Sequence, residues 1–131
     1  AKLQIVVDGE VRMEELVCDG VILSTSAGST GYNYSASGPI IPLGSNVIAL
    51  TAVSAYQPRH WKGGLLKDNA IIKITNTNPS KRPIVAHADH IEAKDVISVE
   101  VEMSNGLEIP LLFDSDHKIE DRVYREMFKS N

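Results

Sequence analysis

The chain has 131 residues, of which 43% are hydrophobic and 23% charged, with a formal net charge of −4. This composition is typical of a soluble globular protein, and we expect a single domain over residues 1–131. The acidic balance and the scattered Lys and Arg residues speak against a nucleic-acid partner, and no apolar run approaches the roughly 20 residues of a membrane span. No signal peptide is visible, and the single cysteine, Cys18, has no internal partner for a disulfide, so we expect a cytoplasmic location.

The first predicted element is a β-hairpin over residues 3–17. Apolar residues alternate on both sides of Asp8-Gly9, a dipeptide that favours a tight type I′ turn. We therefore interpret Asp8 as a turn residue without a catalytic role.

The next stretch predicts a short strand over 21–23, a turn of small residues, and a helix. The helix is expected to begin at Ser29 or Thr30, where hydroxyls can cap its free N–H groups, and to close at Gly38-Pro39. Two interpretations remain open. The corner is either a buried structural turn with ordinary caps, or a ligand site where small residues admit the ligand to the backbone near a helix N-terminus.

Later segments continue the β pattern. Strands are expected over 47–53, 70–75 and 83–88, a second hairpin around Asn105-Gly106, and a helical tail over 119–128, with residues 54–68 irregular. Seven to nine short strands with one or two helices predict a mainly β fold.

Other site chemistries fit the sequence poorly. His87 and Asp89 would share one face of a strand while His90 points to the other, which is poor geometry for a metal, and we expect no metal ligands. The G-x-S-x-G motif and the lysine of a P-loop are both absent. Cys18 is expected to be a small buried residue, since nothing suggests an adjacent base.

The most specific pattern is DGVILSTSAGSTGYNYSASGP, at residues 19–39. It resembles, without a gap, a stretch in the carboxy-terminal half of the NAD kinases (ATP-NAD and polyphosphate-NAD kinases), D-G-[LIV]-[IV]-x-[ST]-T-P-T-G-S-T-A-Y-S-x-S-A-G-G-P. This family transfers a phosphoryl group to the 2′-hydroxyl of NAD, giving NADP. The resemblance implies a β-sandwich-like domain of hairpins, with one short helix after the third strand.

The resemblance also implies a set of NAD contacts. Asp19 would contact the nicotinamide amide or a ribose, and the helix start would line the dinucleotide site. The implied NAD-binding residues are Asp19, Thr30, Gly31, Tyr32, Asn33, Ser35 and Asp89. Gly31 replaces the family's Ala, which opens space for the ligand at a helix-propensity cost of about 1 kcal/mol. Ile91 stands where the family has a polar residue in the turn at Asp89.

The family's catalytic motifs are absent from this sequence. A Gly-Asp-Gly motif, whose Asp is the proposed base, and an Asn-Glu or Asn-Asp pair belong to an amino-terminal α/β domain in the family. Asp8 and Asp19 are each followed by Gly but preceded by Val7 and Cys18. We therefore expect no catalytic residue here, an amino-terminal kinase domain as partner, and no activity of the 131 residues alone.

The resemblance implies NAD and ATP as ligands, with Mg²⁺ or another divalent metal accompanying ATP, and a homodimer or homotetramer. Two other functions remain open. One is a non-catalytic nucleotide-binding or oligomerisation module of the same fold. The other is a related lipid or sphingoid kinase, which would need a more apolar pocket than this Ser- and Thr-rich stretch.

Overall fold

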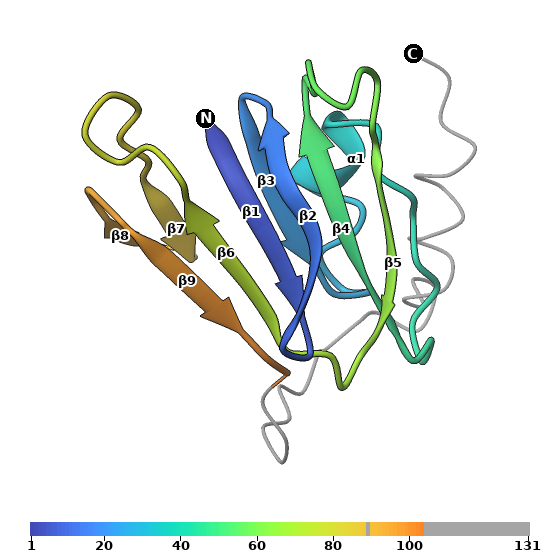
Figure 1. Ribbon diagram of the computed structural model, residues 1–131. Coiled ribbons are helices and arrows are strands. Elements are labelled where there is room, and N and C mark those ends of the chain that lie inside the picture. The colour runs from blue at the N-terminus through green and yellow to red at the C-terminus, as the bar shows by residue number, and fades with distance from the viewer. Residues whose placement is uncertain (89, 104–131) are drawn as a thin grey trace. The chain divides into compact units, whose positions relative to one another are not determined.

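The computed structural model describes residues 1–88 and 90–103 of the chain (Figure 1). These residues form nine strands and one short helix, and their sheets are antiparallel, which confirms the mainly β fold and the helix after the third strand. The elements are β1 (Lys2–Val7), β2 (Glu10–Val17), β3 (Gly20–Ser24), α1 (Tyr32–Ser35), β4 (Val47–Val53), β5 (Gly63–Lys67), β6 (Ile72–Asn76), β7 (Ala86–Ala88), β8 (Ile91–Ala93) and β9 (Ser98–Val101). The predicted Asn105-Gly106 hairpin and the helix over 119–128 lie outside the described residues.

The described residues divide into two compact units. The first unit contains residues 1–21, 52–62 and 69–103, and the second contains residues 22–51 and 63–68. The expectation of a single domain over 1–131 stays a prediction. Within the described residues no helix has the length and apolar character needed to cross a membrane.

The first unit contains a four-stranded sheet in the order β2-β1-β6-β9, and β7 pairs separately with β8. Alternate residues of β1 are buried, with Leu3 3% and Ile5 2% exposed. Ile5 pairs with Ile74 on β6, so the two-residue period seen in the sequence produces the buried face of this sheet.

The predicted turn at Asp8-Gly9 joins β1 and β2. Asp8 has φ 50° and Gly9 has φ 80°, as a type I′ turn requires, which confirms the prediction. Asp8 does more than turn the chain, because its Oδ1 accepts a hydrogen bond from the Ile71 N–H at 2.8 Å and its own N–H donates to the Ile71 carbonyl at 2.9 Å. The turn is therefore attached to the segment that enters β6.

The second sheet has the order β3-β4-β5. β4 has the bounds predicted from its apolar run, whereas β5 corrects the expectation that residues 54–68 are irregular. Gly63 pairs with Thr51 at φ +115°, and a Cβ on it would collide with the Leu50 carbonyl. Gly63 therefore allows the two strands to approach closely.

Candidate functional site

The predicted NAD-binding run lies in the second unit, between β3 and β4. Tyr32 is 68% exposed, Gly31 and Ser35 are also exposed, and Thr30 is half-buried. Asn33, by contrast, is only 1% exposed. The structure thus presents four of these five neighbouring residues at the surface and buries the fifth.

The helix start differs from the expectation. α1 has four residues, its N-cap is Gly31, and no side chain caps it. The expected cap from Ser29 is wrong, because the Ser29 hydroxyl accepts a hydrogen bond from the Ile41 N–H and donates one to the Ser26 carbonyl, both at 2.9 Å. Gly31 therefore lies outside the helix interior, and the propensity cost expected for it does not apply.

The helix end is also different from the predicted Gly38-Pro39 stop. Ser37 takes the left-handed conformation with φ 67°, and its N–H bonds to the Tyr34 carbonyl at 3.0 Å. The Gly38 N–H bonds to the Asn33 carbonyl at 2.8 Å. This pattern is a Schellman motif, in which the left-handed position after the helix is usually Gly. Here Ser37 occupies that position, so Gly38 must serve another purpose.

Asn33 belongs to a group of three buried polar residues, Ser29, Asn33 and Thr51, which we call the polar cluster. The Thr51 hydroxyl donates to Asn33 Oδ1 at 2.6 Å. Asn33 Nδ2 donates in turn to the Ser29 carbonyl at 3.2 Å and to the Pro39 carbonyl at 2.8 Å. All three side chains are at most 1% exposed, and no buried side-chain nitrogen or oxygen in the described part of the chain lacks a partner.

Gly38 leaves room for the polar cluster. A Cβ on Gly38 would overlap Asn33 Oδ1 and lie 2.5 Å from Thr51 Oγ1. Both atoms are fixed by the hydrogen bond that they share, so neither can move aside without breaking it. Gly38 is thus required for space, and its φ lies outside the left-handed region.

A weak indication of this cluster is present in the sequence. Thr51 is the one polar residue in the apolar run of β4. A polar side chain in a buried strand needs a hydrogen-bond partner, so that position could have been recognised. Its partner, 18 residues earlier in the chain, could not.

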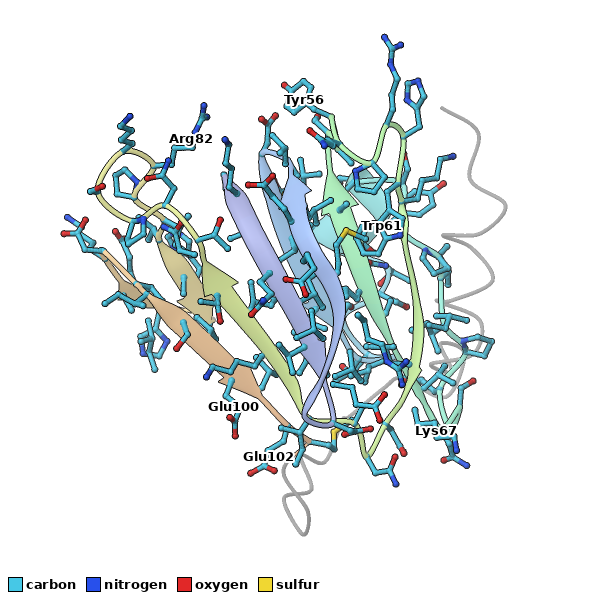
Figure 2. All side chains as sticks on the ribbon, in the orientation of Figure 1. Tyr56, Trp61, Lys67, Arg82, Glu100 and Glu102 are labelled. Carbon is cyan, nitrogen blue, oxygen red and sulfur yellow. The ribbon has the colours of Figure 1, made fainter. Side chains whose placement is uncertain are left out.

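Asp19 lies in the first unit and is described there by itself. It is exposed, and its backbone N–H donates to the Val53 carbonyl at 2.9 Å. The Tyr56 hydroxyl, on the loop after β4 (Figure 2), donates to Asp19 Oδ1 at 3.5 Å. The loop is held nearby because the Tyr56 N–H donates to the Val17 carbonyl at 2.7 Å. Tyr56 is a neighbour of Asp19 that sequence reasoning missed, since 37 residues separate them.

The remaining candidates offer little chemistry. Cys18 is 1% exposed, as expected, and burial raises the pKa of its thiol, which keeps it protonated and unreactive. Within residues 1–88 and 90–103, no three His, Cys, Asp or Glu residues gather as a metal site would require. His87 and His90 are exposed. Asp89 lies outside the described residues, and its predicted contact with NAD stays a prediction.

Comparison with known proteins gives the family. The family model described as the ATP-NAD kinase C-terminal domain matches residues 1–61. The NAD kinase of Cereibacter sphaeroides is 50% identical over 128 residues, which cover 98% of this chain and 50% of that protein. The NAD kinase of Caulobacter vibrioides is 47% identical over 130 residues, covering 99% and 50%. The chain therefore spans about half the length of the curated relatives it matches.

Solved structures share the fold. An NAD kinase from Archaeoglobus fulgidus, solved in complex with ATP, aligns with a TM-score of 0.68 and 24% identity, covering 79% of this chain and 39% of that one. Yeast NADH kinase complexed with NADH aligns with a TM-score of 0.63 and 24% identity, covering 76% and 30%. About half of the residues of this chain are identical to those of NAD kinases along nearly all of its length, so the chain belongs to the NAD kinase family and corresponds to its carboxy-terminal domain.

Proposed function

We propose that this chain forms the NAD(H)-binding half of an NAD kinase, an enzyme that transfers the terminal phosphoryl group of ATP or polyphosphate to the 2′-hydroxyl of NAD. The observation that carries the proposal is the exposure of Gly31, Tyr32 and Ser35, beside the half-buried Thr30, next to a polar cluster whose side chains are all hydrogen-bonded. A rigid support beneath an accessible polar surface is what precise placement of a substrate hydroxyl requires.

Each residue of the run that reaches the surface has a role that suits a dinucleotide. Thr30 and Ser35 supply hydroxyls that can donate to or accept from ribose and amide groups. Tyr32 offers a ring face as well as a phenolic hydroxyl. Gly31 carries no side chain, so a ligand can approach its backbone.

Asp19 is proposed to accept a hydrogen bond from a hydroxyl or amide of NAD. Its carboxylate is exposed, and its backbone is fixed by the bond from its N–H to the Val53 carbonyl. The Tyr56 hydroxyl occupies only one oxygen of the carboxylate, so the other is available to a ligand.

Phosphoryl transfer depends on positioning and on stabilising the charge of the transferring group. This sequence contains neither a Gly-Asp-Gly motif nor an Asn-Glu or Asn-Asp pair, so we propose that an amino-terminal domain supplies the base and the contacts to ATP. The 131 residues alone would then be inactive.

Mg²⁺ or a similar ion would accompany ATP, and the described residues offer it no cluster of ligands. We further propose that the enzyme is a homodimer or homotetramer in the cytoplasm.

A chimaeric enzyme tests this function. The half of the Cereibacter sphaeroides NAD kinase that this chain matches would be replaced by the chain, and NADP formation would be measured with ATP and Mg²⁺. We expect the chimaera to turn over NAD and the isolated chain to show no turnover.

Titration calorimetry with NAD provides the binding arm of the experiment. Tyr32→Ala should weaken NAD binding by about tenfold, the equivalent of one good contact, while Leu65→Ala, at an exposed position on β5, should not. A chimaera that folds but neither binds NAD nor forms NADP would contradict the proposal. Binding without turnover would instead favour a non-catalytic nucleotide-binding module.

A further inference from the structure

We propose that Asn33 and Thr51 are positioning residues for NAD, acting through the backbone on either side of residues 30–32 rather than by touching the ligand. The inference rests on the proposed function and deepens it. The family resemblance places Asn33 among the NAD contacts. Here we infer that Asn33 instead holds the backbone of the neighbouring NAD-binding residues in place.

The first argument is the complete use of the Asn33 side chain. Its oxygen accepts from the Thr51 hydroxyl at 2.6 Å, and its nitrogen donates to the carbonyls of Ser29 and Pro39. The amide offers two N–H donors, and both are engaged. With 1% of the residue exposed, a ligand has almost no surface of Asn33 to contact.

The second argument is the position of these bonds along the chain. Asn33 follows Tyr32 directly, and the carbonyl that it binds belongs to Ser29, which precedes Thr30. The three residues 30–32 are therefore held at both ends by one side chain. Thr51 attaches that side chain to the buried strand β4.

The third argument is that the same cluster also fixes the return path of the chain. Asn33 binds the Pro39 carbonyl, and the Ser29 hydroxyl accepts from the Ile41 N–H at 2.9 Å. These hydrogen bonds connect the chain segment before α1 to the segment after it. A one-turn helix has too few internal bonds to be stable by itself, so its orientation depends on these attachments.

Thr51→Val gives the sharpest test because the two side chains have nearly the same shape. Valine removes the donor to Asn33 Oδ1 and leaves a buried acceptor unpaired, which frees the amide to rotate. In the complete gene product, we expect the KM for NAD to rise about five- to tenfold, the equivalent of one hydrogen bond. The KM for ATP should change less than about twofold, since the cluster supports only the NAD side.

Two further variants separate positioning from stability. Thr51→Ser keeps the hydroxyl and should restore most of the affinity for NAD. Ile48→Val removes one buried methyl group from the same strand, so it should lower the melting temperature by a few degrees, about as much as Thr51→Val. It should leave the KM for NAD within about twofold of wild type.

The outcomes are distinct. If Thr51→Val lowers the melting temperature but leaves both KM values unchanged, the cluster is only structural and the inference is overturned. If Ile48→Val raises the KM for NAD as much as Thr51→Val, general loosening explains the effect, and the inference again fails. If the wild-type protein itself shows no binding or turnover of NAD, the proposed function fails, and the inference fails with it.

Discussion

Two turns of this chain show different ways of satisfying polar groups. The Asp8-Gly9 turn is exposed, and its two residues adopt positive φ values that the dipeptide favours by itself. The turn over residues 29–38 buries Ser29 and Asn33 and obtains the hydroxyl bonded to Asn33 from Thr51 on another strand. The first turn combines a favourable local conformation with the two hydrogen bonds between Asp8 and Ile71, whereas the second depends on the tertiary hydrogen bonds of its buried side chains.

A glycine illustrates the difference in each turn. Gly9 has φ 80° and nothing within 4 Å of a Cβ placed on it, so it is needed for conformation. Gly38 lies outside the left-handed region, but its Cβ would overlap the bonded atoms of Asn33 and Thr51, so it is needed for space. Glycine is thus required at these two positions for different physical reasons.

The largest effect is expected for Gly38→Ala. The added methyl group must displace Asn33 and break the bond to Thr51, so we expect the free energy of unfolding to fall by about 3 kcal/mol. Urea unfolding measures this loss. Gly31→Ala is the matched control, because its Cβ would meet only the Gly28 carbonyl at 3.4 Å, and it should change stability by less than about 0.5 kcal/mol. Equal losses in the two variants would show that space is not the reason for Gly38.

Gly9→Ala should have a smaller effect of about 1 to 2 kcal/mol, the cost of a left-handed conformation for a residue with a Cβ. Gly9→Asn should recover much of the loss, since Asn tolerates this region. Comparing the loss of thermal stability in the two variants shows whether backbone conformation or side-chain packing limits this position. If Asn is as destabilising as Ala at this position, the strain argument for the first turn is wrong.

Ser37→Gly should stabilise the protein by about 0.5 kcal/mol. Ser37 has φ 67° in a position where Gly is usual, and relief of this strain exceeds the extra entropy that Gly gives the unfolded chain. The gain would be read from the urea midpoint. A loss of stability would indicate that the Ser37 side chain contributes to the second turn.

The smallest effect concerns Cys18, a buried group that titrates, unlike the hydroxyls and amide of the polar cluster. Burial raises the pKa of its thiol in the folded protein, so the folded state holds its proton more tightly than the unfolded state. This contribution is fully present below the unfolded thiol pKa of about 8.5 and is lost as pH rises through the folded pKa. Cys18→Ala should therefore flatten the fall of stability as the pH rises above about 8.5, relative to wild type. Identical pH profiles for the two proteins would contradict this assignment.

Local patterns in the sequence predicted the elements that depend on neighbouring residues. The Asp8-Gly9 hairpin and the bounds of β4 follow from turn preference and a continuous apolar run. β5 was missed because Gly63-Gly64 is typical of a loop, and no local pattern shows that Gly63 lies against the Leu50 carbonyl. The length of α1 was overestimated because its Ser and Gly residues were interpreted as caps, whereas Ser29 and Gly38 serve the polar cluster.

The sequence by itself determined the mainly β fold, the hairpin, and the family, whose motif at residues 19–39 is contiguous. Only the tertiary structure decided which residues of that motif face outward and which support it. Exposure of Tyr32 and burial of Asn33, one residue later, depend on a hydroxyl that Thr51 brings from another strand. The physical reason is that a buried amide must find hydrogen-bond partners wherever the fold places them, and no local pattern names those partners.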